Sequence, residues 1–328
     1  MRVLIVKLSS LGDVVHTMPA VHDIRTAFPG AQVDWAVEPL YAPLVRRVEG
    51  IGEVIDCPLR RWRKAWWTRS VRAEWASLRK RLQSVKYDAV IDMQGLTKSA
   101  WIARTAHGPS HGLANRTEGS SHEWPAAWLV DHPINVEPHI HAMDRARTLA
   151  AKALGFETQG APRYGLRSRP MAPAERPTVV FVHGSSRDDK LWPQAHWISI
   201  GKRLIDAGWR IALPQGNEAE QTRAEMIGAA LQFDRTHRVE VWPALKLDAV
   251  VDRLAATQGV IGVDSGLSHI AVALNLPHVQ IYNFPTAWRT GPQPAHGQRH
   301  QVCVEGQSVP GLEAVWSAWN QVREAGGA

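Results

Sequence analysis

Residues 3–20, VLIVKLSSLGDVVHTMPA, decide the fold of this chain. The β-branched run at residues 3–6 predicts a buried strand, the polar residues 9–13 predict a turn, and the pattern from 14 to about 28 predicts a helix. An apolar strand that ends in a turn and opens a helix is typical of parallel sheets that are covered on both faces.

The same alternation runs along the chain and starts again in its second half. Further strands are predicted at residues 33–37, 89–92, 178–183, 210–213, 239–242 and 260–263, and further helices near 197–207, from 219, at 247–255 and from 267. Between the two runs, the proline-rich residues 159–177 have no clear periodicity and predict a linker. We therefore expect an α/β chain of two doubly wound domains, with a ligand cleft between the carboxyl ends of both sheets.

The positive charge is concentrated in one segment. The 328 residues have a formal net charge of +7, but residues 60–81 contain nine basic residues and one acid, so this segment carries +8 and the remainder −1. That distribution excludes a uniformly basic protein of the histone type. With 45% hydrophobic and 21% charged residues, wholesale disorder is excluded as well.

The two cysteines and the short apolar runs bear on where the protein is located. Cys57 and Cys303 cannot form a disulfide framework or a four-cysteine zinc site, so we expect two thiols in a reducing compartment. The N-terminal apolar run is interrupted by Lys7 and is too short for the core of a signal peptide, and no run approaches about 20 apolar residues. We expect a cytoplasmic protein whose membrane contact is peripheral.

Residues 66–82 predict an amphipathic helix. Its apolar face consists of Trp67, Val71, Trp75, Leu78 and Leu82. The basic residues fall off that face, so the helix is either a ridge for an anionic partner or a solvated surface. The preceding residues 60–64, RRWRK, bring four mutually repelling cations together, which a structural role explains less well.

The absence of three common motifs disfavours three classes of enzyme. The chain has no G-x-G-x-x-G fingerprint, no phosphate-binding G-x-x-x-x-G-K-[ST] loop and no H-E-x-x-H, which disfavours a dehydrogenase, a P-loop enzyme and a zinc protease. Three strand-to-helix junctions that are rich in small polar residues remain. In the first, residues 9–13, Asp13 lies in the first turn of a helix, where it either caps the helix or acts as a general base.

The other two junctions carry groups suited to phosphate. In the second, Ser185, Ser186 and Lys190 can contact phosphate oxygens, whereas Asp188 and Asp189 allow a metal site that the flanking cations make unnecessary. In the third, residues 264–269 (DSGLSH), a glycine at a helix start forms an anion site to which a histidine can add a donor. Glu218, after the strand at 210–213, either holds ribose hydroxyls or is a surface acid at a helix start.

Five stretches together resemble the lipopolysaccharide heptosyltransferases. They are residues 3–20, RRWRKAWW (60–67), YDAVIDMQGLTKSA (87–100), SSRDDKLWP (185–193) and GVDSGLSHIAVAL (262–274), in the family's order over nearly the whole chain. Within the family they are most similar to the branch whose members add heptose to Kdo. The resemblance implies a GT-B fold of two Rossmann-like domains, with an acceptor domain at 1–165, an ADP-sugar domain at 166–311, and a helix at about 312–328 that can pack back on the first domain.

The activity that this resemblance implies is inverting transfer of L-glycero-D-manno-heptose from ADP-heptose to Kdo of Kdo2-lipid A, with no metal and no cofactor. Asp13 is the implied general base, Lys190 the diphosphate lysine and Glu218 the ribose acid. The other implied donor-site residues are Ser185, Ser186, Asp264, Ser265, Gly266 and His269, and the implied acceptor-site residues are Ser10, Arg60, Arg61, Arg63 and Lys64. Ser265 stands where threonine is commoner, and residues 281–286 (IYNFPT) depart from the turn of many members, so no role passes to Thr286.

The implied partners are ADP-heptose and Kdo2-lipid A, for a monomer at the inner face of the inner membrane that binds no nucleic acid. One alternative is a heptosyltransferase II-type enzyme, which adds to heptose. Another is a nucleic-acid-binding protein that uses residues 60–81, although such a protein needs cations spread over a longer surface. Whether Trp62 and Trp66 contact the acceptor or the core stays open.

Overall fold

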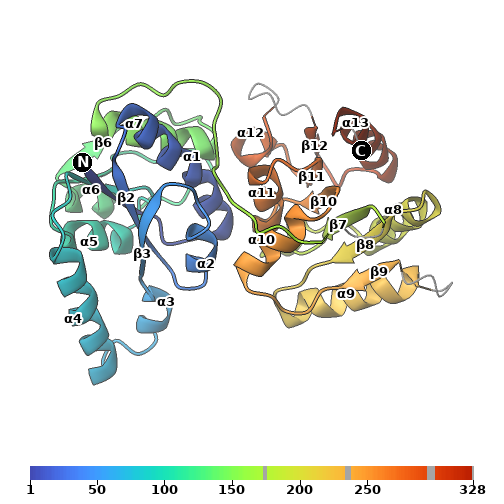
Figure 1. Cartoon of the computed structure of the whole chain (residues 1–328), viewed down its shortest axis with the longest axis horizontal. Coiled ribbons are helices and arrows are strands. Elements are labelled where there is room, and N and C mark those ends of the chain that lie inside the picture. The colour runs from blue at the N-terminus through green and yellow to red at the C-terminus, as the bar shows by residue number, and fades with distance from the viewer. Residues whose placement is uncertain (173–175, 233–237, 294–299, 327–328) are drawn as a thin grey trace. The chain divides into compact units, whose positions relative to one another are not determined.

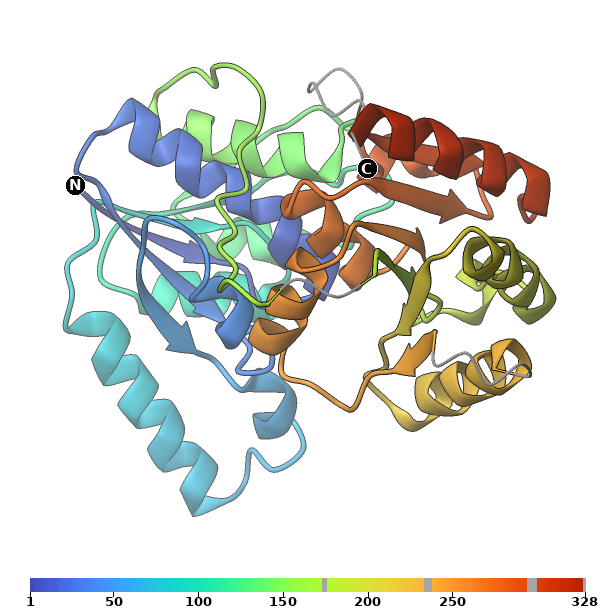
Figure 2. The same cartoon turned by 45° about the vertical axis from the view of Figure 1, so that its right-hand side comes forward.

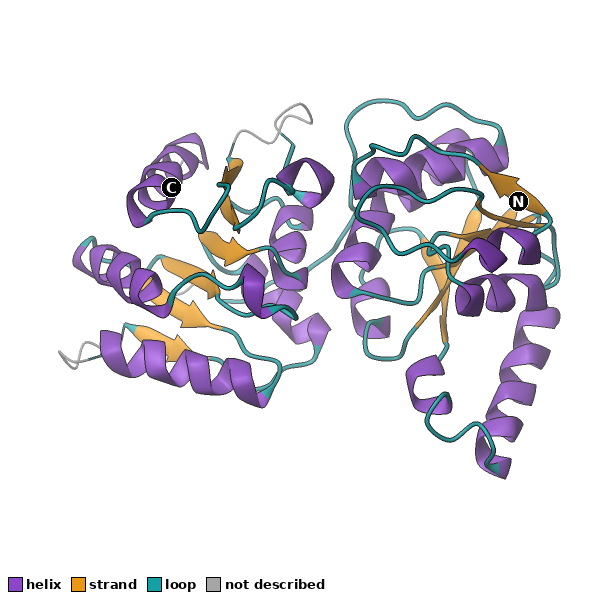
Figure 3. Ribbon diagram, turned by 180° about the vertical axis from the view of Figure 1, so that it is seen from behind, coloured by secondary structure: helices purple, strands orange, loops and turns teal. Residues whose placement is uncertain are grey.

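The computed structural model describes residues 1–172, 176–232, 238–293 and 300–326. Its contacts divide the chain into two units, Met1–Leu166 and Arg167–Ala328, with a border next to the one expected from the sequence. Each unit is built on a six-stranded parallel sheet, and helices lie on the faces of each sheet (Figure 3). The α/β class with two Rossmann-like sheets is confirmed, and the cleft between the domains stays a prediction.

The sheet of the first unit has the strand order β3-β2-β1-β4-β5-β6 (Figure 1). The strands are β1 (Arg2–Val6), β2 (Gln32–Val37), β3 (Ile51–Asp56), β4 (Ala89–Asp92), β5 (Ser110–Leu113) and β6 (His132–Ile134). Because β1 pairs with both β2 and β4, the strand order reverses beside β1. Ligands of doubly wound sheets bind at the carboxyl end of such a switch point, so the residues after β1 and β4 form the natural site of this unit.

Helices of the first unit form two groups of neighbours. They are α1 (Leu11–Ala27), α2 (Ala42–Val45), α3 (Leu59–Trp62), α4 (Arg69–Gln83), α5 (Thr97–Thr105), α6 (Trp124–Leu129) and α7 (Ala142–Leu154). In the first group, α7 packs along α1, and the buried Arg147 donates two hydrogen bonds to Asp23, over 2.7 and 3.1 Å. In the second group, α5 contacts both α4 and α6. The pairing of α7 with α1 brings residues that are more than 120 positions apart to one site.

Helix α4 begins three residues later than the sequence predicts. The hydroxyl of Thr68 accepts a hydrogen bond from the Val71 amide over 3.4 Å, and this cap fixes the start of the helix. Val71, Leu78 and Leu82 are buried as expected. The assignment of Trp67 to the same face was wrong, because it precedes the cap and its side chain is 60% exposed.

The second unit repeats the plan with the strand order β12-β11-β10-β7-β8-β9. Its strands are β7 (Thr178–Val182), β8 (Arg210–Leu213), β9 (Val239–Val241), β10 (Gly259–Val263), β11 (His278–Tyr282) and β12 (Gln301–Glu305). Its helices are α8 (Gln194–Asp206), α9 (Glu218–Leu231), α10 (Leu247–Ala255), α11 (Gly266–Ala273), α12 (Ala287–Thr290) and α13 (Leu312–Gly326), with a 3-10 turn, η1 (Asp188–Lys190). Here the order reverses between β7 and β10, which again marks the site.

The C-terminal helix α13 belongs to the second unit. It packs on β11, β12 and α8, and in Figure 2 it lies beside the sheet of that unit. Val315, Trp319 and Val322 are fully buried there, and a Cβ atom on Gly259 would come within 2.5 Å of the Trp319 ring. The expectation that this helix packs back on the first domain was wrong, because its apolar face completes the core of the second unit.

Candidate active site

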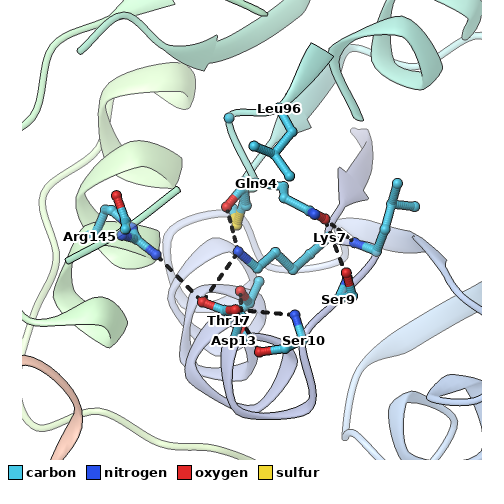
Figure 4. A network of polar contacts seen from close by, with 12 residues as sticks. Lys7, Ser9, Ser10, Asp13, Thr17, Gln94, Leu96 and Arg145 are labelled. Atoms are coloured by element: carbon cyan, nitrogen blue, oxygen red, sulfur yellow. Dashed lines mark hydrogen bonds and ion pairs between the residues drawn. The ribbon is translucent and has the colours of Figure 1, made fainter. Parts of the chain in front are cut away.

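Asp13 lies in the first turn of α1, directly after β1 and its turn. Its Oδ2 accepts hydrogen bonds from the Ser10 amide (3.1 Å) and the Ser10 hydroxyl (2.8 Å), as Figure 4 shows. The carboxylate therefore does cap the helix, which was one of the two roles expected for it. The side chain remains 36% exposed, so the cap does not withdraw the carboxylate from a substrate.

Two cations face the other oxygen of Asp13. Lys7, which is only 3% exposed, places Nζ 3.7 Å from Oδ1 and also donates to the Met93 carbonyl over 3.1 Å. Arg145 on α7 places Nη2 3.8 Å from the same oxygen and donates to the Thr117 hydroxyl over 2.9 Å. The carboxylate is thus held from both sides, by a helix-start serine and by two inward-pointing cations (Figure 4).

These neighbours set the protonation state of the carboxyl. Burial favours the neutral acid, but Lys7, Arg145 and the Ser10 hydrogen bonds outweigh it and lower the pKa of Asp13 to about 2. Burial and the nearby Arg145 lower the pKa of Lys7, while Asp13 opposes them. At neutral pH Asp13 is a fixed, ionised, partly exposed carboxylate, which is the form that a proton acceptor needs.

Asp92, the last residue of β4, and Gln94, which follows that strand, fix the turn that precedes Asp13. Gln94 accepts the amides of Leu8 (2.8 Å) and Ser9 (3.3 Å) with its side-chain oxygen. Asp92 in turn accepts the Gln94 amide and the Ser99 hydroxyl, each over 3.0 Å, and burial raises its pKa to about 6. These residues were not among the predicted site residues, although polar groups that end a strand next to the first one are the signal that points to them.

The predicted acceptor cluster lies on α3 and the turn after it. Arg60, Arg63 and Lys64 are exposed, and the guanidinium of Arg60 lies 5.6 Å from the centroid of the Tyr41 ring. Arg61 differs from them because it forms an ion pair with Glu74 of α4. Three of the four cations are therefore available to an anionic partner, and the fourth is matched within the chain.

The two tryptophans of this segment have different surroundings. Trp62 is buried, donates from Nε1 to Glu74 over 2.7 Å and contacts Trp75 edge-on at 6.0 Å between ring centroids. Trp66 is 65% exposed. Trp62 therefore belongs to the core.

In the second unit, the predicted donor residues follow three adjacent strands, β10, β7 and β8. Lys190 of η1 places Nζ 2.5 Å from Oδ2 of the buried Asp264, and Nε2 of His269 lies 3.4 Å from Oδ1 of the same carboxylate. The Ser185 hydroxyl donates to the Asp264 carbonyl over 3.3 Å. Burial favours neutral Asp264, but His269 and Lys190 outweigh it and hold its pKa well below the usual range.

This cluster joins a cation to the start of a helix. Ser265 is the N-cap of α11 and Gly266 its first residue, so the free amides of the first turn lie next to Lys190 and Asp264. Ser186 is exposed in the same loop as Ser185. The structure thus brings Ser185 and Lys190 of the second junction to Asp264 and His269 of the third.

The two aspartates of η1 do not form a metal site with other ligands. Asp189 pairs with Arg187, and the turn is fixed by Asn283, whose Nδ2 donates to the carbonyls of Asp189 (2.9 Å) and Leu191 (3.0 Å). Within residues 1–172, 176–232, 238–293 and 300–326, no group of three or more His, Cys, Asp or Glu side chains could hold a metal ion.

The two acids after β8 have different surroundings. Glu218 is exposed at the first position of α9, and its side chain is not part of the cluster. Glu220, two residues later, accepts the Gly216 amide over 2.7 Å and lies against Gly184, where a Cβ atom would come within 2.7 Å of it. The sequence signal is the spacing Asn217-x-x-Glu220 at a helix start, where the Asn217 side chain accepts the Glu220 amide over 2.9 Å and the Glu220 carboxylate turns back to the Gly216 amide.

A family model described as glycosyltransferase family 9 (heptosyltransferase) matches residues 75–315. The chain belongs to glycosyltransferase family 9. It is 39% identical over 310 residues to lipopolysaccharide heptosyltransferase 1 of Escherichia coli strain K12, covering 92% of this chain and 93% of that one. To lipopolysaccharide heptosyltransferase 2 of the same strain it is 26% identical over 296 residues, covering 86% and 82%.

A solved structure of the family agrees with the fold. The Escherichia coli heptosyltransferase WaaC with ADP-2-deoxy-2-fluoro heptose is 37% identical, with a TM-score of 0.80 and coverage of 99% of this chain and 98% of that one. The assignment to the lipopolysaccharide heptosyltransferases, and with it the enzyme class, is confirmed. The nucleic-acid-binding alternative is set aside.

Proposed function

We propose that this enzyme transfers L-glycero-D-manno-heptose from ADP-heptose to Kdo of Kdo2-lipid A in the lipopolysaccharide inner core. The observation that carries the proposal is the ionised, partly exposed Asp13 at the switch point of the first sheet. The WaaC structure with an ADP-heptose analogue supports the donor. The higher identity to heptosyltransferase 1 than to heptosyltransferase 2 of the same strain supports Kdo over heptose as the acceptor.

Asp13 is the proton acceptor of the proposed step. An acceptor hydroxyl attacks the anomeric carbon of the heptose while its proton passes to the Asp13 carboxylate, and the bond from that carbon to the ADP oxygen breaks on the opposite face. One displacement of this kind inverts the anomeric centre. Lys7 and Arg145 keep the carboxylate ionised and fix its orientation, so they are positioning residues.

The second unit supplies the groups that stabilise the leaving ADP. Negative charge develops on the departing diphosphate, and Lys190 with the first-turn amides of α11 can stabilise it. Asp264 uses one Lys190 proton and leaves the other two for phosphate oxygens. We propose that these fixed groups do the work of a metal ion and that the reaction needs no cofactor besides its donor substrate.

A turnover assay with ADP-heptose and Kdo2-lipid A, with and without EDTA, tests the function. We expect transfer to Kdo at the same rate in both. Transfer to a heptosylated acceptor instead of Kdo would identify the II-type enzyme, and loss of transfer on chelation that Mg²⁺ restores would refute the metal-free step.

Glu220 and Glu218 form a matched pair for the donor site. Because a carboxylate accepts hydrogen bonds from ribose hydroxyls better than an amide does, Glu220→Gln is expected to weaken ADP binding by about ten-fold. Glu218→Gln, two residues away on the same helix, is expected to change it less than two-fold, by about the scatter of surface substitutions. Calorimetric titration with ADP measures both, and the reverse ranking would restore Glu218 as the ribose acid.

The α3 cations are proposed to bind the phosphates and carboxylates of the acceptor. Replacing Arg60, Arg63 and Lys64 together by alanine is expected to raise KM for Kdo2-lipid A by at least about ten-fold, because each lost charge-assisted hydrogen bond is worth about 1.5–3 kcal/mol before solvent screening. KM for ADP-heptose should stay unchanged. Arg61→Ala serves as the control with a smaller effect, since Glu74 already neutralises that cation; equal effects on both substrates would refute an acceptor-side role.

The proposed acceptor also suggests where in the cell the enzyme works. Because Kdo2-lipid A is anchored in a bilayer, we propose that the enzyme works at the inner face of the inner membrane and contacts it peripherally. We propose separately that it is a monomer. Among the helices of the described residues, none has the length and hydropathy to cross a membrane.

A further inference from the structure

Every tryptophan that is more than half exposed lies in the first unit. They are Trp66 (65%), Trp67 (60%), Trp101 (54%), Trp124 (62%) and Trp128 (76%). The tryptophans of the second unit are buried or half-buried. An isolated exposed apolar residue needs no explanation, but a group of large aromatic side chains on one unit does.

Trp101, Trp124 and Trp128, here called the tryptophan patch, are exposed on the adjacent helices α5 and α6. Trp124 and Trp128 are one turn apart on α6, with ring centroids 4.3 Å apart. Trp101 lies on α5 between Thr97 and Arg104, which occupy the same helical face.

Contacts at both ends of α6 fix it along that face of α5. The Thr97 amide donates to Glu123, just before α6, and Arg104 donates to the carbonyl of Leu129, at its end. Trp101 therefore lies on a helix that is bonded at both of its ends to the helix of Trp124 and Trp128.

The neighbouring helix α4 provides positive charge. It covers the sheet next to α5, with its apolar residues turned inward. Its exposed cations, here called the basic face, are Arg69, Arg72, Arg79 and Lys80. Within the described part of the chain, none of these four has an acidic partner within salt-bridge distance.

We propose that the tryptophan patch and the basic face of α4 together dock the enzyme on an anionic phospholipid bilayer. Tryptophan rings favour the headgroup region because they are apolar and carry one polar N–H, and clustered Lys and Arg are attracted to anionic lipids. The inference rests on the proposed function, in that a membrane-anchored acceptor requires the enzyme to reach the bilayer. The aromatic rings on α5 and α6 and the cations on the adjacent α4 fit a lipid surface, in which negative headgroups lie directly over apolar chains.

Vesicle co-sedimentation of the full chain tests the docking surface. The probes are phosphatidylethanolamine vesicles with phosphatidylglycerol and, for comparison, vesicles of phosphatidylcholine alone. W101S/W124S/W128S is expected to lower binding to the anionic vesicles on the order of ten-fold at both low and high salt, because apolar insertion is not screened. Replacing the four cations of the basic face by glutamine is expected to lower binding at low salt only. Leu40→Ser and Met226→Ser, which remove other exposed apolar side chains, are the matched controls and should bind like wild type.

Activity separates this proposal from the proposed function. On a water-soluble, deacylated acceptor the tryptophan variant should keep wild-type kcat and KM, whereas on vesicle-embedded acceptor its KM should rise with the loss of binding. If wild type transfers no heptose but the binding pattern holds, the proposed function fails and the docking surface stands.

Unchanged vesicle binding by the tryptophan variant would overturn the proposal. So would a wild-type dimer in solution that the substitutions separate, since the patch would then be covered by a second copy. If the triple variant is unstable by thermal melting, Trp128→Ser alone, at the most exposed ring, should still lower binding measurably, and wild-type binding would again refute the docking surface.

Discussion

Asp13→Asn is expected to lower kcat by about 10³-fold, within the range that a positioned general base contributes. The asparagine keeps the size of the side chain and its bond from the Ser10 amide, but it cannot take up the acceptor proton. Since Asp13 lies in the first unit and the donor residues in the second, the Kd for ADP should remain within two-fold of wild type. Steady-state kinetics and calorimetry measure the two quantities.

Asp144→Asn on α7 is the control, because this partly exposed carboxylate is also near an arginine but faces no predicted substrate. It should retain wild-type turnover. Turnover near wild type in Asp13→Asn would remove Asp13 as the base, and loss of ADP binding in that variant would indicate a wider structural defect.

The pH dependence follows from the same carboxylate. With a pKa lowered from 3.8 to about 2, Asp13 is already ionised at every pH above about 3–4, so it should impose no acid limb on kcat/KM between pH 4 and 7. The stability that its ion pairs contribute is fully present above pH 3.8 and is lost as the pH falls through about 2. Lys7→Met removes one of the stabilising charges and should move any acid limb from Asp13 upward in pH.

Lys190→Met is expected to lower kcat/KM for ADP-heptose on the order of 10²–10³-fold. This is the loss seen when one preorganised electrostatic stabiliser is removed from an active site. Methionine keeps much of the apolar stem and removes the charge that faces the diphosphate. The Kd for ADP should rise as well, while KM for the acceptor stays close to wild type. Initial rates at varied donor and acceptor concentrations separate these effects.

Two further variants locate the origin of the loss. Lys190→Arg keeps a cation beside Asp264 and should recover part of the activity. Arg187→Met, a neighbouring exposed cation that pairs with Asp189, should lose much less. If Lys190→Met leaves ADP binding intact, the lysine is only a structural partner of Asp264 and the leaving group is stabilised elsewhere.

Three elements were predicted with the bounds that the structure gives them. The strands at 89–92 and 210–213 and the helix at 247–255 have the predicted bounds, because continuous apolar runs end in turn residues there. The sequence did not predict several elements, most of them short or polar, which acquire their structure from contacts with their neighbours; they are β3, β5, β6, β11, β12, α2, α3, α5–α7 and α12. Among the site residues, Asp13, Lys190 and Asp264 follow recognisable strand-to-helix turns.

Several side chains have surroundings that come from other segments of the chain. Trp62 belongs to the core because Glu74 and Trp75 reach it from the next helix. Glu220 rather than Glu218 faces the donor loop because α9 turns that side toward Gly184. Helix α13 packs on its own unit because Trp319 fills the space above Gly259.

By itself, the sequence determined the α/β class, the two-unit plan, the family and the presence of a carboxylate and a lysine at strand ends, since these depend on local periodicity and on motifs within a few residues. Only the tertiary structure decided that Lys7 and Arg145 hold Asp13 ionised, that Arg61 is neutralised, and which tryptophans are exposed. Burial and charge pairing arise from segments that are far apart in the chain, and no local pattern records them.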